Sequence, residues 1–330
     1  MQRTLKTVFA FFAGVAALEC KSDTGTGVDM WAAFKAPKGT DYAYMDPQTP
    51  LNKSKHNMNS TSVGALGETL LQLWTSKSVE YIIWNDEPLP PQKLYNFTTG
   101  HTKAVWAWNV ESGDAFILKH SIPLFPAGPS LTSKYLGLGS NAWMYGQNAA
   151  CFSTSVDSLA ALAVPLLLTV PSIYDQRTSA ATPPPLAALA GGAASSDPIC
   201  TTLSFSTRGG INITYFGKST QWNNELYSEC IAPTLNVSLA VESWIRGSAE
   251  GPACAATEVL DIQKVSYPGL GDFSEYDDHS KWAVGLDTDW FCASDINRMT
   301  TQFKRGGGAY CWRTPLSDTM RSVAVAMNNC

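Results

Sequence analysis

The stretch AVWAWNV-ESGD-AFIL, residues 104–118, decides the fold class. Two runs rich in β-branched and aromatic residues flank ESGD, whose composition is typical of a turn, so the stretch predicts a β-hairpin. A similar run, VEYIIW at 79–84, stops at Asn85-Asp86-Glu87-Pro88 and predicts a further strand ended by a turn. The tryptophans at 106 and 108, together with Trp282, are expected to pack in the core.

Two other segments indicate helix. Residues 62–74 place leucines at 66, 70, 71 and 73, a spacing typical of an amphipathic helix. Residues 178–196 are rich in Ala, Pro and Gly and are expected to form a surface insertion that contributes little to the core; Pro183-Pro184-Pro185 would start one short helix, leaving 191–196 as loop. Strands mixed with helices favour an α/β class over an all-β sandwich.

The ends of the chain and its cysteines indicate export. Arg3 and Lys6 precede a short apolar run from Val8 to Leu18, which predicts a signal peptide over residues 1–17 cleaved near Ala17, with no membrane anchor after it. Eight cysteines in an exported chain predict disulfides, and the lack of Cys-x-x-Cys spacing argues against a metal site. Five sequons, at Asn52, Asn59, Asn96, Asn212 and Asn236, agree with a glycoprotein.

The net charge of −5 argues against tight binding of nucleic acid at neutral pH, because contacts to phosphate dominate such affinity. In acid, carboxylates begin to lose their charge and histidines gain one, so the electrostatic cost of meeting a polyanion falls.

Two short motifs carry the candidate chemistry. His101-Thr102-Lys103 and His279-Ser280-Lys281 lie about half the mature chain apart, and each is followed by an aromatic-rich, strand-like run. In a strand, residues two apart share a face, so each motif would place an imidazole beside an ammonium. Two such pairs at one point suit phosphoryl transfer: one imidazole attacks phosphorus, the other protonates the leaving oxygen, and the lysines neutralise the phosphate.

The surroundings of these motifs resemble the deoxyribonuclease II family. The similarity rests on Gly100-His101-Thr102-Lys103, Asp278-His279-Ser280-Lys281-Trp282, Tyr145-Gly146-Gln147 before Cys151, and Arg305-Gly306-Gly307-Gly308 before Cys311. It extends from about Cys20 to Cys330 and includes Val28-Asp29-Met30-Trp31 and Asn85-Asp86-Glu87-Pro88.

The resemblance implies a fold and an activity. The family is related to the phospholipase D superfamily, which implies a pseudo-twofold arrangement of two α/β sandwich halves with mixed sheets. It implies endonucleolytic cleavage of DNA in acid without metal or other cofactor, through a phosphohistidine, leaving 3′-phosphates. It also implies the disulfides Cys20–Cys151, Cys254–Cys330 and Cys292–Cys311, which leave Cys200 and Cys230 to pair.

Further site residues follow from the same resemblance. Asn297 is placed to bind substrate phosphate, and Asp295 and His120 are weaker candidates for which capping or core hydrogen bonding is an equal explanation.

Asp277 lies two residues before His279 and could orient it, with Asp278 pointing away; the alternative is that residues 275–278 form a solvated acidic loop.

We therefore expect a leader (residues 1–17), an N-terminal half (18–165) and a C-terminal half (166–330) that form one compact catalytic unit. The expected protein is a secreted or lysosomal nuclease acting on DNA, with a homodimer as one open possibility for its oligomeric state. The alternative is an inactive secreted relative of deoxyribonuclease II that binds nucleic acid or acts as an effector. Retention of all four His and Lys residues favours the enzyme.

Overall fold

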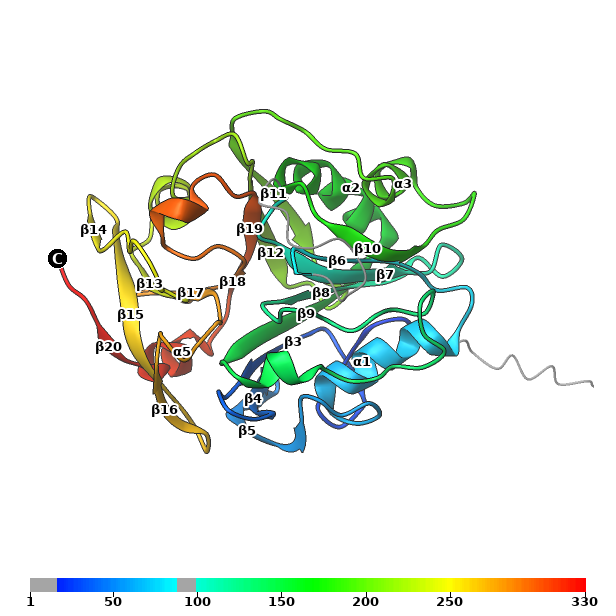
Figure 1. The fold of residues 1–330 in the computed structure, drawn as a ribbon, viewed down its shortest axis with the longest axis horizontal. Coiled ribbons are helices and arrows are strands. Elements are labelled where there is room, and N and C mark those ends of the chain that lie inside the picture. Colours follow the sequence, from blue (N-terminus) through cyan, green and yellow to red (C-terminus); the bar gives the residue numbers. More distant parts are fainter. Residues whose placement is uncertain (1–16, 88–98) are drawn as a thin grey trace, which may run out of the picture.

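The computed structural model describes residues 17–87 and 99–330, and two large β-sheets dominate it (Figure 1). The first sheet has eight strands in the order β10-β6-β7-β8-β9-β3-β4-β5, and all the strand pairs described in it are antiparallel. Its strands are β3 (Met30–Lys35), β4 (Asp41–Asp46), β5 (Thr49–Asn57), β6 (Glu80–Asn85), β7 (Lys103–Trp108), β8 (Asp114–His120), β9 (Gln147–Ser155) and β10 (Ile173–Arg177). The expected leader and the Asn96 sequon lie almost wholly outside the described residues.

The second sheet is mixed. Its main order is β11-β12-β19-β18-β17-β13-β15-β14, with β16 and β20 pairing to β15, and β13 runs parallel to β15. Its strands are β11 (Cys200–Ser206), β12 (Asn212–Lys218), β13 (Leu239–Glu242), β14 (Ala253–Cys254), β15 (Glu258–Tyr267), β16 (Gly271–Ser274), β17 (Trp282–Gly285), β18 (Trp290–Ser294), β19 (Gly307–Arg313) and β20 (Ala324–Met327). A small separate pair joins β1 (Cys20–Lys21) to β2 (Gly27–Val28).

Helices are few and short. They are α1 (Gly64–Thr75), α2 (Val156–Leu166), α3 (Pro184–Ala190), α4 (Ala232–Leu235) and α5 (Ser317–Val323), a π-helical turn at Tyr227–Ile231, and 3₁₀ turns at Ser140–Trp143, Leu167–Thr169 and Thr300–Gln302. In Figure 1, α1 lies on one side of the first sheet and the pair α2 and α3 on the other. The mixture confirms the expected α/β class.

The hairpin that the sequence predicts is present. Strands β7 and β8 pair antiparallel with Trp106 opposite Ile117, and β6 lies on the other side of β7. Because β7 is covered on both faces, its side chains alternate between two cores instead of between core and solvent. Trp106 and Trp108 lie in the core shared with α2, α3 and the second sheet, whereas Val105 and Ala107 lie in the core on the side of α1.

The two sheets pack face to face through aromatic side chains. Phe152 of β9 lies 5.2 Å from Trp312 of β19 and 5.6 Å from Tyr310, measured between ring centroids. Trp106, Trp108 and Trp282 are fully buried in the same core, as the sequence analysis expected. This interface brings the start of β7 near the start of β17, and the two His-x-Lys motifs precede those two strands.

The Ala/Pro/Gly segment differs in part from expectation. Pro184 opens α3 as predicted, and the stretch after Gly191 is mostly exposed. The expectation that the segment contributes little to the core is wrong for Leu186 and Leu189, which are fully buried against α2. Their spacing of three residues places both on one face of the helix, and that face packs inward.

All four disulfides match the pairs that the family resemblance implied. They are Cys20–Cys151, Cys200–Cys230, Cys254–Cys330 and Cys292–Cys311. The Cys292–Cys311 bond joins residues directly opposite each other on β18 and β19.

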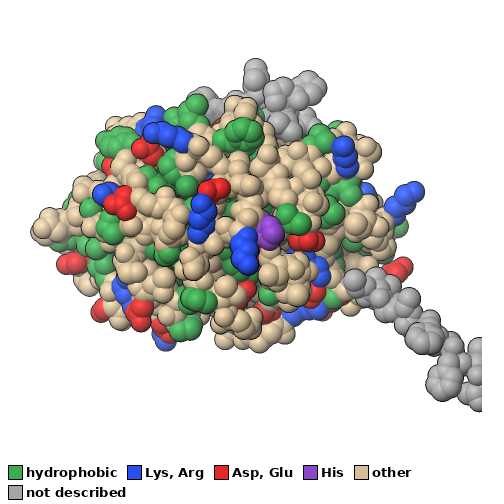
Figure 2. Space-filling model, turned by 90° about the horizontal axis from the view of Figure 1, so that it is seen from below, with side chains coloured by type: hydrophobic (Ala, Val, Ile, Leu, Met, Phe, Trp, Pro, Cys, Tyr) green, Lys and Arg blue, Asp and Glu red, His purple; other side chains and the backbone are tan. Residues whose placement is uncertain are grey.

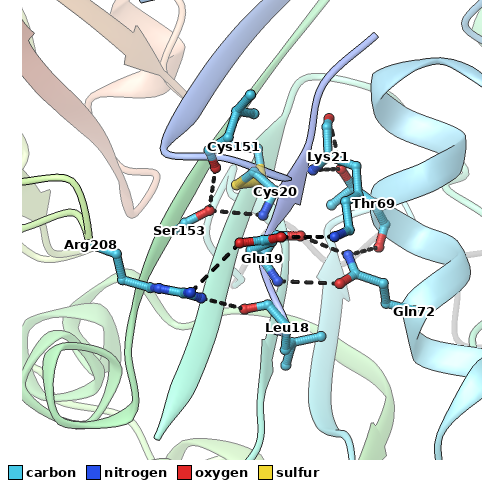
Figure 3. The surroundings of a disulfide bond; sticks show 10 residues. Leu18, Glu19, Cys20, Lys21, Thr69, Gln72, Cys151, Ser153 and Arg208 are labelled. Carbon is cyan, nitrogen blue, oxygen red and sulfur yellow. Dashed lines mark hydrogen bonds and ion pairs between the residues drawn. A yellow bond between two sulfur atoms is a disulfide. The ribbon is translucent and has the colours of Figure 1, made fainter. Parts of the chain in front are cut away.

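The Cys20–Cys151 bond lies in a dense set of contacts that fixes the start of the described chain (Figure 3). The Cys20 amide donates to Ser153 Oγ on β9 at 2.9 Å. Gln72 of α1 both accepts from the Glu19 amide and donates to the Glu19 carbonyl, and Arg208 donates to the Leu18 carbonyl. The disulfide thereby couples α1, the first sheet and a loop of the second half.

We predict that the double substitution Cys20→Ser/Cys151→Ser lowers the free energy of unfolding by about 5 kcal/mol, because a chain-entropy model assigns that much to a loop of this length. The bond spans 131 residues. Guanidinium unfolding without reductant measures the loss. Cys292→Ser/Cys311→Ser, which opens a 19-residue span, should cost about 3 kcal/mol. An unchanged unfolding midpoint in the first variant would contradict the prediction.

Candidate active site

His101 lies just before β7, in a place where three backbone segments come very close. Its amide donates to the Gly306 carbonyl at 2.7 Å, and the amide of Gly100 donates to Val170 at 2.9 Å. A Cβ atom on Gly100 would lie 1.9 Å from the Thr169 carbonyl oxygen. Glycine is therefore required before His101, because no larger residue allows this approach.

His279 occupies the matching place before β17. Its amide donates to the Gly146 carbonyl at 2.9 Å. The side-chain amide of Asn148 on β9 then bonds both the N–H and the C=O of Lys281, at 3.0 and 3.1 Å. A side chain of the first sheet thus continues the hydrogen bonding of the second sheet across their interface.

The structure brings the two motifs together. The ring centroids of His101 and His279 are 6.5 Å apart, and both residues are less than a tenth exposed. The local geometry differs from expectation, because β7 begins only at Lys103 and β17 only at Trp282. Strand alternation therefore does not set the histidines; bonds to the opposite half of the chain do.

Each imidazole contacts a backbone carbonyl from the other half. His101 Nδ1 lies 2.6 Å from the Asp295 oxygen, and His279 Nδ1 lies 3.1 Å from the Ser121 oxygen. Ser121 and Asp295 are the first residues after β8 and β18, the strands that return from each motif. A carbonyl only accepts, so both rings must carry their proton on Nδ1, and Nε2 is left as the basic atom of each neutral ring.

Asp86 gathers the cations around His101. Its carboxylate bonds Lys103 Nζ, lies 3.0 Å from a guanidinium nitrogen of Arg305, and lies 4.0 Å from His101 Nε2. Burial alone would raise the pKa of Asp86, but the charges of Lys103, His101 and Arg305 outweigh it and hold that pKa below its usual range.

Both site histidines are poor bases in this environment. Burial lowers the pKa of His101 well below its usual value, and Lys103 lowers it further against the opposing effect of Asp86. Burial lowers the pKa of His279 in the same way, followed by the charges of Lys281 and Lys103. The pKa of Lys281 is also lowered, by burial and then by Lys103 and Lys119. In each of these groups the protonated form is disfavoured by burial and by neighbouring positive charge, so an anion added to the site would stabilise the protonated forms.

The three candidate phosphate ligands lie near the pair but differ in availability. Asp295 meets His101 through its carbonyl, while its carboxylate lies 3.4 Å from Lys119 Nζ. Asn297 Oδ1 accepts from the Trp244 amide at 3.2 Å. His120 is fully buried, its ring stacks on Phe125 at 4.0 Å, and its Nδ1 accepts from the Ile122 amide. Binding of phosphate by these three stays a prediction.

The acidic loop matches its two interpretations only in part. His279 is oriented by the Ser121 carbonyl and by Gln147 Oε1 at 3.2 Å, and not by Asp277. Residues 275–277 are partly or fully exposed, as the solvated loop requires, but Asp278 is fully buried and accepts from the Ser280 amide at 2.9 Å. Strand alternation does not place Asp277 beside His279, because His279 lies outside a strand.

A second buried carboxylate lies behind this loop. Glu242, the last residue of β13, is fully buried, and neither of its carboxylate oxygens has a hydrogen-bond partner among the described residues. Burial raises the pKa of Glu242 well above its usual value, and the charges of Asp278 and Glu275 raise it further. Glu242 is therefore held as the neutral acid in the folded protein at acidic pH.

Over residues 17–87 and 99–330, no group of three or more His, Cys, Asp or Glu side chains is placed to hold a metal ion. In the same ranges, no helix combines the length and the apolar character needed to cross a membrane.

The family model for deoxyribonuclease II matches residues 19–330. The chain belongs to the deoxyribonuclease II family. The expected family is thus confirmed, and membership makes the chain a nuclease, a hydrolase of phosphodiesters.

Relatives within the deoxyribonuclease II family come from distant organisms. A putative deoxyribonuclease-2 of Burkholderia thailandensis is 32% identical over 324 residues, covering 91% of this chain and 90% of its own. Deoxyribonuclease-2-alpha of Sus scrofa is 30% identical over 322 residues, covering 91% and 87%. Plancitoxin-1 of Acanthaster planci is 28% identical over 321 residues, covering 89% and 87%.

The site of this deoxyribonuclease II relative includes residues that sequence reasoning did not place there. They are Asp86, Arg305, Gln147, Asn148 and Glu242. The first three lie in motifs that carried the family resemblance, so their presence in those motifs was an available signal. Glu242 follows the apolar run Leu239-Ala240-Val241, and an acidic residue at the end of such a run was the only local sign of a buried carboxyl group.

We predict that Glu242→Gln makes unfolding stability less dependent on pH. A raised folded pKa contributes stability below the unfolded value near 4.5, and this contribution is lost as pH rises through the folded pKa. The variant should therefore gain on wild type above pH 4.5 by up to about 1.4 kcal/mol per pH unit. Denaturant unfolding from pH 4 to 8 measures the difference.

Glu250→Gln is the matched control for this series, because Glu250 is exposed. It should follow wild type at every pH. A constant offset between Glu242→Gln and wild type across the range would show that Glu242 does not change its charge differently in the folded and unfolded chains.

Proposed function

We propose that this protein is an acid endodeoxyribonuclease that hydrolyses DNA phosphodiesters without a metal ion, through a phosphohistidine, and leaves 3′-phosphate ends. The observation that carries the proposal is the pair of imidazoles, 6.5 Å apart, each with Nδ1 against a carbonyl and each beside a lysine. The relatives named deoxyribonuclease-2 support DNA as the substrate.

In the first step, a neutral Nε2 atom attacks phosphorus and forms an N–P bond. The bond from phosphorus to the 5′-oxygen of the next nucleotide breaks, and the second imidazole, protonated on Nε2, gives that oxygen its proton. Lys103 and Lys281 offset the charge on the non-bridging oxygens, because ammonium groups in a buried site act through a low dielectric.

In the second step, water attacks the phosphohistidine. The second imidazole, now neutral, accepts the proton of that water, and the N–P bond breaks to release a 3′-phosphate. Each imidazole returns to its starting protonation state, so the two steps need no other proton donor.

We assign His101 as the nucleophile and His279 as the general acid. Burial and the charge of Lys103 lower the pKa of His101 despite the opposing charge of Asp86, so the ring stays neutral and the lone pair on its Nε2 is free to attack. Asn297, Asp295 and His120 are proposed as further phosphate-binding residues at the same site, with Asn297 the foremost. The halves 18–165 and 166–330 would act as one catalytic unit, since each orients the histidine of the other.

A secreted or lysosomal location fits the proposed acid chemistry. Four disulfides support passage through an oxidising compartment. The exposed sequons Asn52, Asn212 and Asn236 would accept glycans there without disturbing the core. Figure 2 shows basic side chains scattered among acidic and neutral ones over the described residues of the face drawn, not a continuous basic patch. Binding of DNA would then depend on the buried cations and on acidic pH.

We predict that wild type nicks plasmid DNA at about pH 5 in excess chelator, whereas His101→Ala and His279→Ala are each slower by at least about a hundredfold, the contribution typical of an acid or base in such a step. Gel analysis of initial rates measures the change. His56→Ala is the matched control, because His56 lies on β5, outside the site. The other three of the four histidines in the chain are His101, His120 and His279.

The same assay separates the alternatives. Loss of wild-type cleavage in chelator would overturn the metal-independent mechanism. Wild type no faster than the double variant His101→Ala/His279→Ala would favour the inactive binder or effector that the sequence left open.

We predict a bell-shaped dependence of cleavage on pH with an acidic maximum. One imidazole must be protonated and the other neutral, and both pKa values are lowered from the usual 6.5 by burial and nearby cations. Above the maximum, the rate should fall by about tenfold per pH unit as the acid is discharged. Initial rates from pH 3.5 to 8 measure the profile, and a constant rate from pH 5 to 8 would contradict it.

A further inference from the structure

A pocket of about 240 Å³ opens directly beside His279. His279, Gln147, Tyr145, Trp244 and Met144 are among its lining residues. This space is large enough for a single planar ring system and is open to solvent on one side. The mechanism proposed above makes no use of this space.

Aromatic side chains form one wall of the pocket. The ring of Trp244 meets His279 edge-on with 4.7 Å between centroids, and Tyr145 lies 5.4 Å from Trp244. Neither Trp244 nor Tyr145 is fully buried, so both retain surface for a ligand. Aromatic faces of this kind stack on nucleobases with little regard to base identity, because every base has a π-face.

A cation holds this wall in place. The guanidinium of Arg246 lies 4.8 Å from the ring centre of Tyr145 and 5.2 Å from that of Trp244. Arg246 and Trp244 Nε1 also both donate to the Tyr276 carbonyl. The two rings are therefore fixed before any ligand arrives, which lowers the entropy lost on binding.

The pocket also has a polar group without a partner. Gln147 is fully buried, and its Oε1 accepts from Ser121 Oγ at 2.6 Å. Its Nε2 donates to no atom among the described residues. An unsatisfied buried donor is unfavourable. Because Gln147 has no exposed surface, the aromatic wall and not this amide supplies the contact with a bound base.

We propose that this pocket binds one unpaired nucleobase, that of the nucleotide whose 5′-oxygen leaves. The inference rests on the proposed nuclease function and on His279 as the general acid, since the ring that protonates the leaving oxygen lines the pocket. A base reaches the pocket only when it leaves its stack, so the bound nucleotide is either extruded from duplex DNA or taken from a single strand. Stacking gives weak sequence preference.

An oligothymidylate with one abasic tetrahydrofuran unit tests the proposal through its cleavage pattern at about pH 5. Wild type should cut the bond on the 5′ side of that unit about 5- to 100-fold more slowly than the other bonds, the range that base stacking supplies. Trp244→Ala should cut ordinary bonds more slowly by a similar factor and lose the contrast at the abasic unit. Trp244→Phe should preserve the contrast, because it keeps an aromatic face.

Trp143→Ala is the matched control, since Trp143 is a neighbouring exposed tryptophan outside the pocket. It should cleave like wild type. A wild-type pattern without the slow bond, or a slow bond that persists in Trp244→Ala, would overturn the subsite.

A binding measurement separates this proposal from the nuclease proposal. An oligonucleotide carrying 2-aminopurine is titrated with His101→Ala, which retains the pocket, and its fluorescence should be quenched by stacking. The double variant His101→Ala/Trp244→Ala should show no such quenching. Thermal unfolding should confirm that the single and the double variant both fold. Quenching that depends on Trp244, together with a wild-type protein that does not cleave DNA, would keep the subsite and sink the nuclease. Quenching that ignores Trp244 would sink the subsite alone.

Discussion

The reciprocal contact between each imidazole and a carbonyl of the opposite half is the constraint on which the site depends. His101 meets Asp295 and His279 meets Ser121, so neither ring is oriented until the two sheets have packed together. The contact sets the tautomer of both rings and turns the Nε2 atoms into the reactive ones. The aromatic core between the sheets, the glycines at the backbone crossing and the side chain of Asn148 all serve to maintain this arrangement.

Two buried carboxyl groups show how neighbouring charges decide whether such a group is ionised or neutral. Asp86 lies among Lys103 and Arg305 and stays ionised, so it neutralises cations that would otherwise repel one another. Glu242 is equally buried but has acidic neighbours and no hydrogen-bond partner among the described residues, so its neutral form is preferred. The first carboxylate holds the cationic site together, whereas the second favours the folded state in acid.

Sequence could predict what depends on local pattern. The hairpin of β7 and β8, strand β6 and helix α1 follow from periodicity and turn residues. The four disulfides came from the family resemblance and not from spacing. The partners of the histidines could not be read locally, because Asp295, Ser121 and Gln147 lie far from them along the chain. Reasoning from strand parity misassigned Asp277 because the backbone before β17 is not yet a strand.

The disulfide pattern separates the two halves. Cys20–Cys151 closes within residues 18–165, and the other three bonds close within 166–330. No disulfide crosses the interface at which the imidazoles meet, and all eight cysteines are paired. The four bonds therefore strengthen each stretch of chain by itself and leave the packing of one sheet on the other to non-covalent contacts alone. Reduction of the disulfides would loosen the supports of the two histidines without directly breaking the contact between them.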